Sequence, residues 1–139
     1  MNQNIIFYPL LIQIMLVLLL YILLGIEKSK AVKAGTVDRK ITALHNDAWP
    51  DHVLRVSNNI ANQFETPILF FVLSLVFFSL KAVDVTVLVL SCMYVASRIV
   101  HAYIHVTSNY VPKRLGVFMV GCVILIVLVV LAMKGLMLG

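Results

Sequence analysis

The chain has 139 residues, of which 62% are hydrophobic and 12% are charged, with a mean hydropathy of +1.03 and a net charge of +5. A soluble domain of this size could not cover so much apolar surface, so composition excludes that class of protein. In a soluble chain the positive charge would suggest nucleic acid. In a membrane protein it reports topology instead, and we expect no nucleic-acid partner. The sequence predicts an all-α integral membrane four-helix bundle.

Four long apolar runs predict four membrane spans. About 20 helical residues are needed to cross a hydrocarbon core that is ~30 Å thick. The chain then forms one transmembrane domain, residues 1–139, with spans at about residues 5–26, 57–80, 84–106 and 114–137. The hydrophilic segment 27–56 is the one long loop. In the first span Gln13 is an isolated polar residue, which favours a hydrogen-bonded helix–helix seam.

Basic residues are distributed unevenly between the loops. Those between spans one and two, and between spans three and four, are Lys28, Lys30, Lys33, Arg39, Lys40, Arg55, Lys113 and Arg114. The opposite side has only Lys81 and Lys134. The positive-inside rule then places both basic loops in the cytoplasm and both termini on the non-cytoplasmic side.

Span two carries a polar stripe. Its members are Arg55, Asn58, Asn59, Asn62 and Glu65. At ~100° per residue they share an arc of about 120° on one side of a helix. A charged side chain near the bilayer centre costs roughly 2.5–3.5 kcal/mol, so such residues face a partner or a wet cavity. A single Asn in a membrane span is usually part of a hydrogen-bonded seam between helices. A stripe of several polar residues that ends in a carboxylate favours a functional site instead. Pro67 follows and should kink the helix or free a carbonyl.

Span three carries a second stripe. Tyr94, Arg98, His101 and His105 are spaced by four, three and four residues, which aligns them on one helix face. Counted at 1.5 Å per residue, Asn62 lies ~10 Å below the boundary near Arg55, and Arg98 lies roughly 9 Å from the same face of the membrane. The two stripes are therefore level. We expect them to face each other, within a subunit or between subunits.

Two other sites are compatible with these residues. His101 and His105 share a face at i and i+4, as a metal or haem site would require, but only two ligands are evident and we expect no metal. A small exporter could depend on Glu65 as its one membrane carboxylate. The long basic loop and the late position of Glu65 argue against an exporter.

The two stripes resemble the MAPEG family, the membrane-associated proteins in eicosanoid and glutathione metabolism. The second helix of that family carries a basic residue, an Asn, a Glu and a Pro in this order. That order is met here by Arg55, Asn62, Glu65 and Pro67. An Arg on the third helix is matched by Arg98, with His101 and His105 one and two turns on, and an Arg near the start of the fourth helix by Arg114.

The resemblance implies a homotrimer whose sites lie between subunits and open to the cytoplasm, with glutathione as co-substrate. The residues expected to bind the tripeptide are Arg55, Asn58, Asn59, Asn62, Glu65, Arg98, His101, His105 and Tyr110. Glu65 would meet its amino group and the arginines its carboxylates. Arg114 would be the catalytic residue, since a fixed cation lowers the pKa of a nearby thiol, and Lys113 could take its place.

The chain resembles a bacterial-type member of the family that is similar to microsomal glutathione transferases. This resemblance implies a transferase or peroxidase that acts on lipophilic electrophiles at the cytoplasmic leaflet. The expected location is a bacterial inner membrane. The expected partners are further copies of the chain, membrane lipid and a lipophilic small molecule. The chain departs from many family enzymes at Asn58, where they have a second Arg, and at His101 and His105, where they have tyrosines. These departures favour the alternative, a non-catalytic member that binds a lipid or a partner protein in the same groove.

Overall fold

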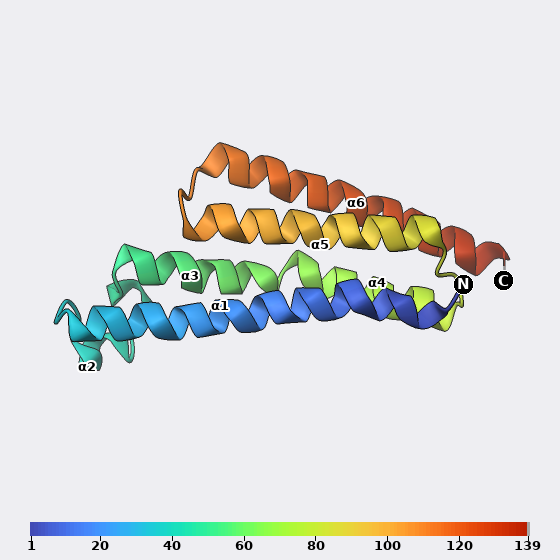
Figure 1. Ribbon diagram of the computed structural model, residues 1–139. Coiled ribbons are helices and arrows are strands. Elements are labelled where there is room, and N and C mark those ends of the chain that lie inside the picture. Colours follow the sequence, from blue (N-terminus) through green and yellow to red (C-terminus); the bar gives the residue numbers. More distant parts are fainter. Residues whose placement is uncertain (139) are drawn as a thin grey trace.

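The computed structural model describes residues 1–138, and within this range the chain is built from helices and their connections alone (Figure 1). In chain order the elements are η1 (Gln3–Ile6), α1 (Phe7–Lys33), α2 (Arg39–Thr42), η2 (Asn46–Ala48), α3 (Asp51–Gln63), α4 (Thr66–Ser79), α5 (Val85–Val106) and α6 (Val111–Leu138). Four helical stretches are long and apolar enough to cross a membrane: Gln3–Lys33, Asp51–Ser79, Val85–Val106 and Val111–Met137. The predicted all-α, four-span architecture is confirmed.

Both termini and the α4–α5 turn lie at one end of the bundle, which we call the terminal end (Figure 1). The segment 34–50 and the α5–α6 turn lie at the other end, which we call the loop end. Helix α1 continues beyond its apolar run as far as Lys33, and α3 already begins at Asp51. The non-helical part of the expected loop 27–56 is therefore much shorter than its hydrophilic composition suggested. Both helices continue beyond the hydrocarbon. Their backbone hydrogen bonds are unchanged there, and water hydrates the charged side chains.

The second span is broken in the middle, as Pro67 predicted. Helix α3 ends at Gln63 and α4 begins at Thr66, with Glu65 between them at φ −95° and ψ −105°. Proline is favoured in the first turn of a helix because its missing N–H would have no partner there, and Pro67 occupies that position. The N–H groups of Phe64 and Glu65 bond to the carbonyls of Ala61 and Asn62, at 3.1 and 3.4 Å. The break therefore leaves few backbone groups unsatisfied.

The apolar core fills the half of the bundle nearest the terminal end. Phe70 packs on Tyr94 with ring centroids 4.8 Å apart, and both side chains are fully buried. Ile6, Leu125 and Leu128 belong to the same cluster. The loop half has only a small second cluster, made of Leu20, Val56, Ile60 and Ala102. Most other polar residues of the two stripes lie in that half, whereas Tyr94 belongs to the apolar core.

A chain of amide hydrogen bonds joins α1, α3 and α5 in the middle of the bundle. Gln13 Nε2 donates to Gln63 Oε1 at 2.9 Å, and Gln63 Nε2 donates to Asn59 Oδ1 at 3.0 Å. Asn59 Nδ2 then donates to the carbonyl of Ala102 at 3.1 Å. All three amide side chains are buried, and interhelical amide bonds of this kind hold membrane helices together. The prediction that Gln13 is a seam residue is confirmed. The chain fixes the rotation of α3, and so the direction in which the rest of its stripe points.

Candidate functional site

The centre of the candidate site is a relay of hydrogen bonds across the two stripes. Arg98 Nη2 donates to Asn62 Oδ1 at 2.8 Å, and Asn62 Nδ2 donates to Glu65 Oε2 at 3.2 Å. The Arg98 side chain is only 1% exposed, and its Nε has no hydrogen-bond partner among the described residues. The prediction that the stripes face each other is confirmed within one chain. Arg98 is connected to Glu65 through Asn62.

Two adjoining cavities open beside this relay, between α3, α5 and α6. The smaller, of about 180 Å³, is lined by Asn62, His101, Val111, Arg114, Leu115 and Phe118. The larger, of about 450 Å³, is lined by Asp51, Leu54, Arg55, Asn58, Asn62, His105, Asn109 and Arg114. Asn62 and Arg114 line both cavities, so the two form one polar site at the loop end. Six of the expected site residues meet there.

Arg114 is held in the site by two side chains. Its Nη1 donates to Asn109 Oδ1 at 2.7 Å and lies 3.2 Å from His105 Nε2. A guanidinium can only donate, so His105 Nε2 is the acceptor and the imidazole must be neutral in this arrangement. Asn109 has φ +50°, a left-handed conformation that Asn tolerates better than most residues. The short α5–α6 turn thus aims an acceptor at the first turn of α6.

Arg55 anchors the loop end of α3 to the end of α5. Its Nη1 donates to the carbonyl of Thr107 at 3.0 Å, and its side chain also lines the larger cavity. Asp51 lines the same cavity and is the only carboxylate that lines either one. Two guanidinium groups line this cavity and a third, that of Arg98, is bonded to its shared residue Asn62. The site is therefore electropositive, which suits an anionic guest.

The two histidines lie one turn apart on α5 and face α6. Their ring centroids are 5.8 Å apart, and His101 packs against Phe118 at 6.0 Å. His101 is 2% exposed, and its Nδ1 is a buried atom without a hydrogen-bond partner. Among residues 1–138, no group of three or more His, Cys, Asp or Glu side chains is arranged to hold a metal ion.

Comparison with known proteins identifies the family of the chain. The MAPEG family profile matches residues 5–134, which is nearly the whole chain. The chain belongs to the MAPEG family. No significant match was found among curated proteins, and none among solved structures. Together with the four apolar helices, family membership makes this an integral membrane protein of the glutathione and eicosanoid metabolism family.

Four of the expected residues do not line the cavities of this MAPEG protein, and one of them, Arg98, is bonded to the lining residue Asn62. Asn59 stands at one edge of the predicted arc and turns into the amide seam, where it is fully buried. Glu65 lies past the end of α3 and is exposed on the bundle surface, bonded to Asn62 alone among side chains. Tyr110 is 55% exposed in the turn and lines neither cavity. Lys113, the alternative to Arg114, is also exposed, so Arg114 is the cation that reaches the site.

Sequence reasoning did not assign Asn109, Asp51 or Phe118 to the site. Asn109 lies in a turn where an Asn commonly adopts positive φ, which was the one available signal for its role. Asp51 is the first residue of α3, after the N-cap residue Pro50, and its position at the start of a hydrophilic turn gave no sign that it lines a cavity. Phe118 was one apolar residue among many on α6.

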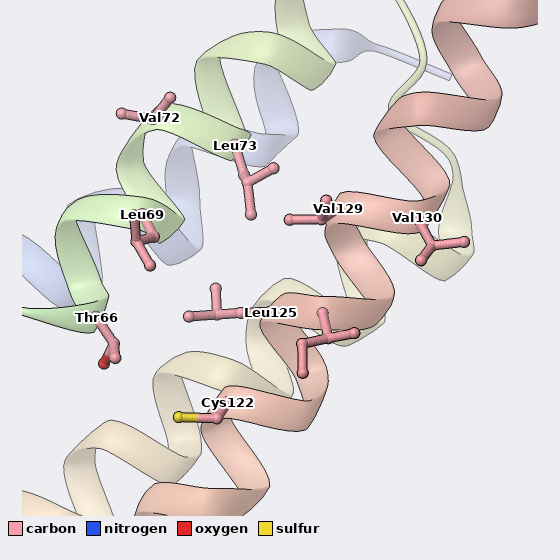
Figure 2. A pocket seen from close by; sticks show the side chains of 9 residues that line it. Thr66, Leu69, Val72, Leu73, Cys122, Leu125, Val129 and Val130 are labelled. Atoms are coloured by element: carbon pink, nitrogen blue, oxygen red, sulfur yellow. The ribbon is translucent and has the colours of Figure 1, made fainter.

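An apolar groove, larger than either polar cavity, lies between α4 and α6, outside the polar site (Figure 2). Its volume is about 510 Å³, and it is lined by Thr66, Leu69, Val72, Leu73, Cys122, Leu125, Ile126, Val129 and Val130. Thr66 and Cys122 sit together at one end, with the aliphatic residues beyond them (Figure 2). Cys122 is one helical turn from Phe118, which lines the smaller polar cavity. The groove thus leads away from the polar site toward the terminal end.

Proposed function

We propose that the chain is a glutathione-dependent membrane enzyme, a transferase or peroxidase for lipophilic electrophiles. The observation that supports this most is the electropositive polar site, where Arg55 and Arg114 line a cavity that also contains Asn62. Glutathione has two carboxylates, an amino group and a thiol. The arginines suit its carboxylates, and Glu65, reached through Asn62, suits its amino group.

Arg114 is the proposed catalytic residue. Asn109 and His105 both hold its Nη1, which leaves the remaining guanidinium N–H groups free to face a thiolate. A fixed cation beside a thiol lowers the thiol pKa and so raises the fraction of the nucleophilic thiolate. With a chloronitroarene, the thiolate sulfur forms the new C–S bond, chloride leaves with the C–Cl electron pair, and the thiol proton passes to water. The arginine acts by charge alone.

The surroundings supply the second substrate. A lipophilic electrophile dissolves in the bilayer and can lie in the apolar α4–α6 groove, one turn of α6 away from the polar site. The excess of cations at the loop end supports a cytoplasmic orientation for that end, where glutathione is available. The termini then lie on the non-cytoplasmic side, and the membrane is a bacterial inner membrane.

We further propose that the working unit is a homotrimer with sites between subunits. In the single chain Glu65 and Phe64 lie exposed at the break in the second span, and Asn58 is exposed about two turns earlier. A carboxylate that faces lipid is costly, so another protein surface should cover this region. A second copy of the chain is the partner that the family resemblance implies.

The test is thiol-dependent turnover by the purified protein in lipid vesicles. We expect conjugation of chlorodinitrobenzene with glutathione, and a fall in kcat of about tenfold or more in Arg114→Gln, because one lowered thiol pKa unit changes the thiolate fraction tenfold. Lys113→Gln is the matched control, since it removes an exposed cation next in the chain and should leave kcat unchanged. No turnover with chlorodinitrobenzene or with a lipid hydroperoxide would contradict the proposal.

One observation favours a second candidate, a non-catalytic lipid-binding protein. The apolar groove, about 510 Å³, is larger than either polar cavity. Lipid that copurifies in stoichiometric amounts, with no turnover of any thiol, would support this function.

A further inference from the structure

A short basic and apolar patch lies at the loop end, away from the polar site. It consists of Arg39, Lys40, Ile41 and Leu44, which we call the α2 patch. Leu44 is 83% exposed and Ile41 is 50% exposed, although both lie outside the four apolar spans. Lipid tails cover the exposed leucines of α1, which lie within the membrane span. They do not cover apolar side chains in a loop outside the span. Some other apolar environment should cover these two side chains.

The local structure fixes the direction of the patch. The chain reverses at Gly35, whose φ is +67°, and Thr36 Oγ1 ties the turn to the carbonyl of Ala31 at 3.0 Å. The Asp38 side chain caps α2 by accepting from the N–H of Lys40 at 2.8 Å. Thr42 is the buried residue of this helix. The segment is therefore folded rather than free.

The four side chains of the patch are all exposed, whereas Thr42 is buried. At ~100° per residue, Lys40 points almost directly away from the side of Thr42, and Ile41 lies about 100° from that side. Figure 1 shows α2 level with the last turns of α1 and on the side of the bundle away from α6. The apolar run of α1 ends at Ile26, and Lys33 lies ~10 Å further along the helix, at the outer edge of a headgroup layer about 5–8 Å thick on each side.

The charges of the patch have no protein partner. Both ion pairs between side chains in residues 1–138 are made to Glu27, by Lys30 and by His52. Arg39 and Lys40 therefore have no carboxylate within ion-pair distance in the described chain. Two free cations beside two exposed aliphatic side chains, at the outer edge of the headgroup layer, fit a surface that is anionic and apolar together.

We propose that the α2 patch is a docking site for the anionic phospholipids of the leaflet at the loop end. Ile41 and Leu44 insert into the headgroup layer, and Arg39 and Lys40 bind headgroup phosphates. Each Lys or Arg near an anionic surface changes such an equilibrium by about fivefold. Helix α1 tethers the segment close to the membrane, so the effective concentration of lipid headgroups around the patch is high. A modest affinity for anionic headgroups is therefore enough for docking. This site does not depend on the proposed glutathione chemistry.

The first experiment uses brominated lipids and the full chain in vesicles. Trp49→Phe removes the only tryptophan of the sequence, and Leu44→Trp introduces a single indole as the fluorescent reporter. In vesicles with about a third phosphatidylglycerol, we expect bromines near the headgroup to quench the introduced indole more strongly than in pure phosphatidylcholine. The difference should vanish at 1 M salt, where the Debye length is only about 3 Å. Quenching that is the same in both lipids and at both salt concentrations overturns the proposal.

The second experiment keeps Leu44 and Trp49 and measures chymotrypsin cleavage after Leu44. When opening is fast, cleavage follows the population of the undocked segment. In anionic vesicles we expect Lys40→Gln to be cleaved about fivefold faster than wild type, and Arg39→Gln/Lys40→Gln about 25-fold faster. Lys113→Gln is the matched control and should be cleaved at the wild-type rate. Protection of Leu44 regardless of lipid charge would mean that a second copy or another protein covers the patch, and would overturn the proposal.

Discussion

The bond between Arg98 and Asn62 can be measured directly by a double-mutant cycle with Arg98→Met and Asn62→Leu. The distance is 2.8 Å and Arg98 is 1% exposed, so its guanidinium depends on Asn62 as its one hydrogen-bond acceptor among the described residues. Hydrogen bonds to charged groups contribute about 1.5–3 kcal/mol, whereas neutral interhelical bonds in a membrane protein average about 0.6 kcal/mol. Because Arg98 also has an unpartnered Nε, we expect the coupling energy to lie near 2 kcal/mol.

The assay is reversible unfolding of the four proteins of the cycle in mixed micelles as the fraction of sodium dodecyl sulfate rises. Asn62→Leu alone should be the most destabilised, because it leaves a buried guanidinium without its acceptor. Arg98→Met in the Asn62→Leu background should restore part of the loss. Ser74→Ala combined with Arg98→Met is the control, and its effects should add within about 0.5 kcal/mol, since Ser74 bonds only to Phe70 of its own helix. A coupling energy of about 0.6 kcal/mol or less between positions 62 and 98 would refute the reasoning.

Three further predictions concern the turn, the seam and the groove. Asn109→Ala removes the acceptor that lies 2.7 Å from Arg114 Nη1, so kcat should fall. It also places Ala at positive φ, so the free energy of unfolding should drop by about 1–2 kcal/mol. Asn109→Gly should lower kcat without that loss of stability, because Gly adopts positive φ freely. Gln63→Leu should cost about 1–2 kcal/mol in detergent unfolding because two buried amides lose their partner, and a Gln13→Leu change in the same chain should cost less than it does in wild type. Leu69→Trp should fill the apolar groove and raise KM for a long-chain electrophile with an unchanged glutathione Kd; equal effects on both constants would mean that the groove is not a separate subsite.

The sequence was sufficient to predict that the two stripes meet and that Arg98 lies level with Asn62. Counting residues from each membrane face placed Arg98 level with Asn62, and these two side chains are bonded in the structure. Pro67 likewise predicted the break between α3 and α4. These predictions succeeded because helix geometry is regular, and polar side chains in an apolar span have few places to go.

Other features depend on tertiary arrangement and could not be read from spacing. Asn59 and Asn62 differ by less than one turn, yet one enters the seam with Gln63 and the other enters the site. The direction of each follows from how α3 is rotated against α1 and α5, which a single helix does not reveal. Asn109 reaches Arg114 only because the α5–α6 turn closes with a positive φ. The apolar groove exists because side chains of α4 and α6 leave space between two separate helices.

The most direct test of the central claim is isothermal titration of the purified protein with glutathione. The account holds that two polar stripes close around one small anionic thiol beside Asn62 and Arg114. It predicts saturable heat in the millimolar range or tighter, and a Kd at least about tenfold weaker in Asn62→Leu, since a lost charge-assisted contact is worth 1.4 kcal/mol or more. No binding heat at millimolar glutathione, or a Kd that Asn62→Leu leaves unchanged, would contradict it.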